Sequence, residues 1–358
     1  MSRVSPGVVS GASYLALIRA CHEGGYALPA INVVGTDSVN AVLEAAARNG
    51  SDVIIQISNG GARFYAGEGL PNAARARVLG AASMARHVHL LAKEYGIAVI
   101  LHTDHADRKL IPWLDDLITM SEDEFRATGK PLFTSHMLDL STEPLEENLA
   151  TSASMLKRLA PLGMGLEIEL GVTGGEEDGI GHDLEEGADN AHLYTQPEDV
   201  LKAWELLSPI GTVSIAASFG NVHGVYKPGN VQLRPEILKK SQDAVQKATQ
   251  SGPKPLPLVF HGGSGSTLEE IREAVSYGVF KMNLDTDIQF AFAHGAARYV
   301  LSHPAAFQHQ IEPETGKPLK SLYDPRKWLR EGEKSVVERL TESFETLGSR
   351  GRSIACKS

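Results

Sequence analysis

The sequence predicts a (β/α)8 barrel with extra helices at both ends of the chain, and three observations support this fold class. Eight short apolar segments alternate with amphipathic helical segments, the pattern of parallel strands joined by helices. The 358 residues exceed the roughly 250 that such a barrel needs. A glycine cluster, HGGSGST, follows the seventh apolar segment, and barrels commonly bind phosphate in the loops after strands seven and eight.

The strands and helices can be placed along the chain from this alternation. Helices are expected at roughly 71–95, 143–160, 197–207 and 266–277, and the last begins with a capping-box pattern, Ser266 followed by Glu269. An open doubly wound sheet is the alternative fold, but its G-x-G-x-x-G loop is missing after the first strand. No linker divides residues 1–358, so we expect a single catalytic domain. The expected strands are 27–34, 52–58, 98–105, 131–139, 165–171, 212–218, 257–263 and 278–285.

Composition excludes several classes of protein. The formal net charge is −10, with acidic and basic residues mixed, which argues against binding to nucleic acid. Cys21 and Cys356 are the only cysteines, so neither a disulfide framework nor a cysteine-based zinc site is expected. No run approaches the ~20 apolar residues of a membrane span. We therefore expect a cytoplasmic enzyme that does not bind membranes.

Histidines stand at the ends of three expected strands. His105, His223 and His261 come at or just beyond the ends of strands three, six and seven. In a barrel these ends converge on one mouth. Three imidazoles with one open position are the ligand set of a catalytic zinc ion. The spacing alone leaves hydrogen-bonded structural histidines as the alternative.

Carboxylates on the fifth strand extend this pattern. Glu167 and Glu169 are two residues apart and share one face of the strand. Inside a barrel such groups are costly unless they are paired or bound to metal, and pairing with Lys281 is the alternative to a metal. The acidic run 176–178 follows in a glycine-rich loop. It is either a solvated loop or the carrier of a mobile catalytic base.

The eighth strand and the glycine cluster suggest a phosphate site. Alternation places Lys281, Asn283 and Asp285 on one face of the strand. The backbone N–H groups of residues 262–264, beside a helix N-terminus, are suited to bind a phosphate, although a simple tight turn is the alternative. A barrel lysine can form a Schiff base, but Lys281 lies deeper than its neighbours, which favours an ion pair.

Several longer strings together resemble the class II, zinc-dependent fructose-bisphosphate aldolases. They are LHTDH, EIELGVTGGEEDG, ASFGNVHGVYKPGN, VFHGGSGST and KMNLDTD, and the similarity extends from about residue 27 to residue 335. The long loop and the YDPR motif resemble the dimeric branch of that family, so a homodimer is expected. Reversible cleavage of fructose 1,6-bisphosphate into dihydroxyacetone phosphate and glyceraldehyde 3-phosphate is the implied activity.

The resemblance implies metal ligands. His105, His223 and His261 would hold the catalytic zinc. Asp139 and Glu169 match positions where the family can hold a second, buried divalent ion. A monovalent cation, K⁺ or Na⁺, is expected near the phosphate.

The resemblance also implies catalytic and substrate-binding residues. Asp104 matches the proton donor and Glu177 the mobile base. Ser58 and Arg326 match positions that bind the phosphate on the aldehyde side. The residues expected to bind dihydroxyacetone phosphate are Gly224, Gly262, Gly263, Ser264, Asn283, Leu284, Asp285 and Thr286.

Three other functions remain open from the sequence. A tagatose 1,6-bisphosphate aldolase differs only in the stereochemistry of one hydroxyl group. A non-catalytic barrel would have lost a ligand or the base, and all of them are present. A metal-dependent hydrolase gives no reason for two phosphate sites.

Overall fold

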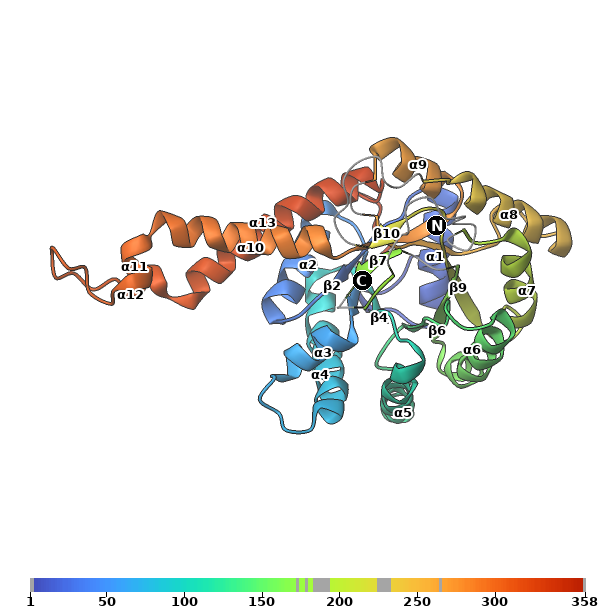
Figure 1. The fold of residues 1–358 in the computed structure, drawn as a ribbon, viewed down its shortest axis with the longest axis horizontal. Coiled ribbons are helices and arrows are strands. Elements are labelled where there is room, and N and C mark those ends of the chain that lie inside the picture. The colour runs from blue at the N-terminus through green and yellow to red at the C-terminus, as the bar shows by residue number, and fades with distance from the viewer. Residues whose placement is uncertain are drawn as a thin grey trace.

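A computed structural model describes residues 3–171, 174–177, 180–182, 194–223, 233–263 and 266–356, with backbone only at 174–177, 180–182 and 222–223. Eight parallel strands form a closed barrel, which confirms the predicted fold class (Figure 1). Around the barrel the strands follow chain order, and β12 pairs with β2 to close it. The strands are β2 (Leu28–Asn32), β3 (Val53–Ile57), β4 (Ala98–Thr103), β5 (Ser135–Leu138), β6 (Gly165–Leu170), β9 (Thr212–Ala217), β11 (Leu258–Phe260) and β12 (Val279–Leu284).

Helices surround this barrel. They are α1 (Ala12–Gly24), α2 (Thr36–Asn49), α3 (Asn59–Ala66), α4 (Ala73–Tyr95), α5 (Ile111–Thr128), α6 (Leu145–Leu159), α7 (Pro197–Leu207), α8 (Glu236–Thr249), α9 (Leu268–Ser276), α10 (Thr286–Ser302), α11 (Pro304–Gln308), α12 (Lys320–Tyr323) and α13 (Pro325–Thr346), with 3-10 turns η1 (Arg108–Leu110) and η2 (Ala160–Leu162). The predicted capping box of α9, Ser266 with Glu269, is wrong, because the box lies one residue further along the chain. Thr267 and Glu270 form it, because this pair has the same three-residue spacing as Ser266 and Glu269. Among the described residues, no helix is long and apolar enough to cross a membrane.

The barrel interior changes from apolar to polar along its axis. Near the amino ends of the strands, α1 packs Tyr14 and Leu17 against Leu28, Ile100 and Phe280. Burying this apolar surface closes that end of the barrel. The polar side chains of the interior therefore lie toward the carboxyl ends of the strands, where barrels hold their functional sites.

Short strands lie outside the eight-stranded barrel. β1 (Gly7–Val8) pairs with the start of β4. A separate small sheet contains β7 (Gly174–Glu177), β8 (Ile180–His182) and β10 (Val222–His223). In that sheet the backbone of His223 lies opposite Gly175. The segment that carries Glu177 is thereby joined to the segment that carries His223.

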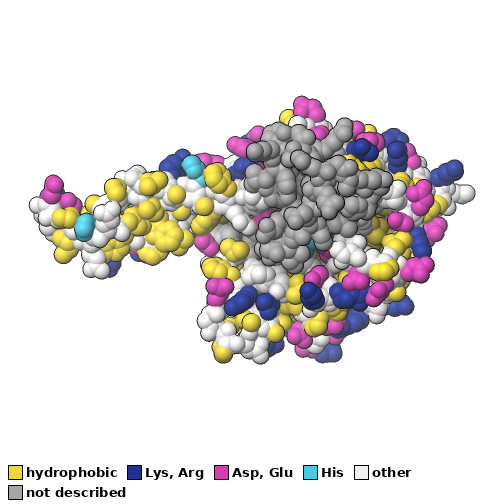
Figure 2. Space-filling model, viewed as in Figure 1, with side chains coloured by type: hydrophobic (Ala, Val, Ile, Leu, Met, Phe, Trp, Pro, Cys, Tyr) yellow, Lys and Arg dark blue, Asp and Glu magenta, His cyan; other side chains and the backbone are white. Residues whose placement is uncertain are grey.

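The C-terminal helices form an arm that projects from the barrel (Figure 1). α10 leaves the end of β12 and α13 returns beside it in the opposite direction, since Asp287 near the start of α10 bonds Arg339 of α13, whereas Tyr299 near its end bonds Leu322. α11 and α12 lie at the outer part of the arm. Figure 2 shows many hydrophobic side chains along it. Four large apolar residues exposed on the arm are Phe290, Leu301, Phe307 and Ile311.

Candidate active site

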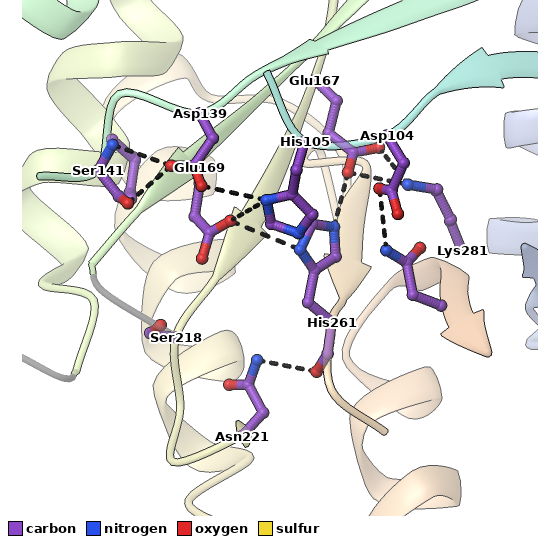
Figure 3. Close-up of polar contacts among 12 residues, drawn as sticks. Asp104, His105, Asp139, Ser141, Glu167, Glu169, Ser218, Asn221, His261 and Lys281 are labelled. Atoms are coloured by element: carbon purple, nitrogen blue, oxygen red, sulfur yellow. Dashed lines mark hydrogen bonds and ion pairs between the residues drawn. The ribbon is translucent and has the colours of Figure 1, made fainter. Parts of the chain in front are cut away.

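The chain turns sharply after β4, where Asp104 and His105 are adjacent. His105 has a φ of 28°, which a non-glycine residue rarely adopts. In an extended strand these two side chains would point to opposite faces. The turn instead brings ligand atoms of Asp104, His105 and His261 within 4.8 Å of one another (Figure 3). Backbone strain of this kind is typical of functional sites.

His105 is oriented by a carboxylate from the next strand. Its Nδ1 lies 3.1 Å from Oδ2 of Asp139, just beyond the end of β5. The other oxygen of Asp139 accepts hydrogen bonds from the backbone N–H and the hydroxyl of Ser141. Burial alone would raise the pKa of Asp139, but the bonds from His105 and Ser141 hold it below its usual range. Asp139 is therefore ionised at neutral pH. It can act in this form either as a metal ligand or as the carboxylate that orients His105.

His261 follows β11 and lies between two carboxylates of β6. Its Nε2 is 2.8 Å from Glu167 Oε1, and its Nδ1 is 3.5 Å from Glu169 Oε2. Burial would lower the pKa of His261, but these two carboxylates outweigh burial and raise it to about 9. Without metal the ring carries both protons at neutral pH, so a binding metal ion must displace one of them.

The donor atoms in this cluster fit a divalent cation. His105, Asp139 and Glu169 form a second group whose ligand atoms also lie within 4.8 Å of one another, and it shares His105 with the first group. Glu169 Oε2 is buried and makes no short hydrogen bond within the described chain, and its nearest partners are the rings of His105 at 3.8 Å and His261 at 3.5 Å, so this oxygen lies among the donor atoms of both histidines. Mixed imidazole and carboxylate donors suit zinc better than calcium or magnesium, which take oxygen ligands.

Two amides hold the carboxylate of Asp104. Its Oδ2 accepts a hydrogen bond from Asn32 Nδ2 at 3.0 Å, and its Oδ1 accepts one from Asn283 Nδ2 at 3.3 Å. Gln56 in turn donates to Asn32. Gln56 was not predicted as a site residue, although alternation along β3 places it on the same inward face as Ile54.

A buried ion pair lies one layer below the cluster. Lys281 Nζ is 2.9 and 2.8 Å from the two oxygens of Glu167, so the structure contains the ion pair that the sequence left as an alternative. Burial would raise the pKa of Glu167, but Lys281, His102 and His261 keep it below its usual range. Lys281 is thereby engaged by a carboxylate and is 2% exposed.

The expected phosphate site lies between β11 and β12. Gly262 has a φ of 60°, a conformation that glycine adopts without strain. α10 begins at Thr286, so its N-terminal N–H groups lie close to Asn283 in the chain, and Asp285 accepts from Gln289 one turn on. The Leu284 side chain is buried in the core outside the barrel, so only its backbone can contact a ligand at the mouth.

The two residues expected at the second phosphate lie far apart. Ser58 follows β3 and caps α3 through a hydrogen bond from Gly61. Arg326 lies in the first turn of α13, with 88% of its side chain exposed, and pairs with Asp324 on the arm. The 17 residues of α10 separate this part of the arm from the barrel by about 25 Å. Within one chain, Arg326 does not join the cluster.

Four predicted positions fall wholly or partly outside the described residues. Gly224 and Ser264 lie outside them altogether. Glu177 and His223 are described only as backbone, in β7 and β10. The structure thus places two of the three expected zinc-binding imidazoles in one cluster with Asp104 and the carboxylates of Asp139 and Glu169, and Asn283 joins it through Asp104.

The fold and this cluster define a (β/α)8-barrel enzyme with a candidate metal site at the carboxyl ends of its strands. The chain belongs to the family described as Fructose-bisphosphate aldolase class-II, which it matches over residues 12–352. This family uses a divalent metal ion.

Relatives and solved structures agree with that assignment. Fructose-bisphosphate aldolase of Campylobacter jejuni is 58% identical over 348 residues, covering 96% of this chain and 97% of the relative. Fructose-bisphosphate aldolase class 2 of Escherichia coli is 51% identical, with 97% of both chains covered. A crystal structure of the Campylobacter jejuni aldolase superposes with a TM-score of 0.89 at 55% identity, covering 99% of this chain and 100% of that one.

Proposed function

We propose that this chain catalyses the reversible aldol cleavage of fructose 1,6-bisphosphate to dihydroxyacetone phosphate and glyceraldehyde 3-phosphate, in glycolysis and gluconeogenesis. The observation that carries the proposal is the convergence of Asp104, His105 and His261 at the barrel mouth, in a member of the class II aldolase family. The relatives are named for fructose bisphosphate, which favours this substrate over tagatose 1,6-bisphosphate. A cytoplasmic enzyme is part of the same proposal.

We further propose that the metal ion is zinc, held by His105, His223 and His261. Zinc would supply the positive charge that stabilises the enediolate formed when a very weakly acidic α-proton leaves the ketone. Asp139 and Glu169 are the residues suited to hold a second divalent ion beside it. We also propose a K⁺ or Na⁺ ion near the substrate phosphate, and the resemblance to the family is the only support for it.

The chain's own groups perform the proton transfers. Glu177, carried on β7, would remove the α-proton of dihydroxyacetone phosphate in the condensation direction. Asp104 would protonate the aldehyde oxygen as the carbon–carbon bond forms, and Asn32 and Asn283 keep its carboxylate in place. Separate acid and base groups allow each to be positioned for one atom of the substrate.

Backbone groups and short polar side chains would bind the first phosphate. They are supplied by Gly224, residues 262–264 and residues 283–286, next to the N-terminus of α10. A helix N-terminus attracts anions because its N–H groups are unpaired and the helix dipole is positive there. Phosphates at both ends of the substrate anchor it far from the reacting carbons.

A coupled assay with two sugars tests this function. Triose-phosphate release is measured from fructose 1,6-bisphosphate and from tagatose 1,6-bisphosphate with zinc-loaded protein. We expect kcat/KM to be at least roughly tenfold higher for the fructose substrate, since a site that hydrogen-bonds one hydroxyl disfavours its epimer. Preference for tagatose bisphosphate would contradict the substrate assignment, and no cleavage of either sugar would contradict the function.

We propose that the second phosphate site is completed in a homodimer. Arg326 lies in the first turn of α13, on the arm, with 88% of its side chain exposed. The arm exposes large apolar side chains, with Phe290 70% and Leu301 78% exposed, and such surfaces commonly form interfaces. A second copy packed on the arm would receive Arg326 at its own mouth, near Ser58.

Mixing an impaired variant with an inactive one tests the dimer. Arg326→Ala should lower kcat/KM roughly tenfold or more, since it removes a charged phosphate contact, and His261→Ala should remove the metal. After random exchange of subunits, half of the dimers are mixed and each has one intact site, so about a quarter of wild-type activity should return. No recovery, with exchange verified by mass spectrometry of a tagged subunit, would show that Arg326 does not act across subunits.

A further inference from the structure

The ion pair of Lys281 and Glu167 is enclosed in the barrel. Lys281 is 2% exposed and Glu167 is 1% exposed. A buried ion pair contributes little net stability, and apolar residues of similar size often replace one without loss. The proposed mechanism uses neither residue. The contacts of Glu167 beyond Lys281 indicate what the pair does.

Beyond Lys281, Glu167 contacts two histidines: Nε2 of His102 lies 3.4 Å from its Oε2, and His261 meets it on the side of the ring away from the donor cluster. Its Oε1 is 2.8 Å from Nε2 of His261, while Lys281 donates to both of its oxygens. A carboxylate held in this way by an ammonium group acts only as an acceptor. The hydrogen between Glu167 and His261 is therefore on Nε2 of the imidazole.

The other nitrogen of His261 is turned toward the donor cluster. Its Nδ1 is 3.5 Å from Glu169 Oε2, and its ring centroid is 4.7 Å from that of His105. Figure 3 shows Glu167 and Glu169 on either side of this ring. An imidazole binds a metal ion through the nitrogen that carries no proton, and the partner of the other nitrogen decides which one that is.

We propose that Glu167, fixed by Lys281, is a positioning residue that keeps the proton of His261 on Nε2 and so presents Nδ1 to the metal ion. Lys281 orients the carboxylate and neutralises it, so that an acceptor can stand below the metal centre without adding net charge. This inference rests on the proposed function only in treating the cluster as a metal site.

Two double variants isolate the acceptor from the charge and the volume. E167Q/K281M and E167M/K281M both lack the ion pair, and glutamine and methionine are similar in length. The glutamine retains a carbonyl oxygen that can accept from Nε2, whereas the methionine does not. E167L/K281M removes the same acceptor with a smaller side chain, so a folding failure of one apolar variant does not end the comparison.

Metal affinity is the measurement, independent of activity. Metal-free full-length protein is titrated with Co²⁺ against a competing chelator, and folding is checked by thermal unfolding. Loss of a hydrogen-bonding partner of a metal-binding histidine typically costs about 10–100-fold in affinity. We expect a loss in that range for E167M/K281M and E167L/K281M, and affinity at least about tenfold higher for E167Q/K281M than for either.

Asp52→Asn provides a matched control at the opposite end of the barrel. Asp52 is a buried carboxylate that accepts from Ala98, Ser353 and Ile354. Its replacement should lower the unfolding temperature without changing Co²⁺ affinity.

Equal affinity of the glutamine and apolar variants, whether high or low, would overturn the proposal, because the acceptor would then make no difference. Failure of the proposed function gives a different result, which is seen in the wild-type protein. Either that protein does not bind Co²⁺ at the cluster, or it binds Co²⁺ but its zinc-loaded form does not cleave fructose 1,6-bisphosphate.

Discussion

The His261→Ala variant should lose cleavage of fructose 1,6-bisphosphate by at least about 10³-fold and should no longer retain zinc. His261 is 1% exposed and lies between Glu167 and Glu169, so its removal takes away an imidazole ligand and leaves a buried gap beside two carboxylates. Two remaining imidazoles bind zinc much more weakly than three. Without the metal, the charge that develops on the substrate oxygen has no strong stabilising partner.

Chelation of the wild-type protein should have the same effect as this substitution. Zinc content is measured by atomic emission, and cleavage is assayed before and after dialysis against a chelator. Added zinc should restore the wild-type enzyme but not the variant. His89→Ala is the matched control, because His89 on α4 bonds the Leu132 carbonyl away from the cluster, and it should retain both zinc and activity.

Full activity after exhaustive chelation would contradict the metal mechanism. The remaining possibility would be a Schiff base on Lys281, detected as inactivation by borohydride in the presence of dihydroxyacetone phosphate. The structure argues against that outcome. Lys281 is buried and donates to both oxygens of Glu167, so its amine is engaged below the site.

The barrel was predictable because its signals are local. Each strand is a short apolar segment, and the polar residues that interrupt the pattern come where the strands end. Alternation within a strand also predicted that Glu167 faces the interior, and with it the Lys281 pair. The capping box shows the limit of such patterns, because Ser266 and Thr267 are both followed by glutamate three residues later and only the structure distinguishes them.

Other features depend on contacts between distant segments. The direction of the arm follows from how α10 and α13 pack, which no local pattern records. The position of Arg326, exposed on that arm, could not be inferred from a motif match. Two functional side chains at the adjacent positions 104 and 105 already require a turn of the chain there, but only the structure gives its geometry, a φ of 28° at His105.

Asp104→Ala should abolish cleavage and condensation but should still exchange the α-proton of dihydroxyacetone phosphate with deuterated water. Proton exchange needs only the metal, the phosphate site and the base. Protonation of the aldehyde oxygen is a later step, and we assign it to Asp104. A general acid or base typically contributes about 10²–10⁴-fold, so cleavage should fall by at least this factor while exchange stays within about threefold of wild type.

Glu177→Ala is the comparison variant. It removes the proposed base, so it should lose exchange and cleavage together while keeping its zinc. A change of less than about tenfold would be too small for a general base and would point to Glu176 or Asp178. Asp104→Asn separates the size of the side chain from its acidity. Asparagine has nearly the same size as aspartic acid but cannot act as an acid toward the substrate. This variant should behave like the alanine variant.

The structure gives a specific alternative role for Asp104, and the zinc content of the variant decides between the two. Asp104 shares a group of ligand atoms with His105 and His261, so its carboxylate is close enough to orient or bind the metal ion. If that is its main role, Asp104→Ala should lose zinc, and exchange should fall as far as it does in Glu177→Ala. If Asp104 is the proton donor, zinc and exchange should both remain while cleavage is lost. Loss of exchange with zinc still bound would contradict the assigned division of proton transfers, because a group that acts only on the aldehyde oxygen is not needed to form the enediolate.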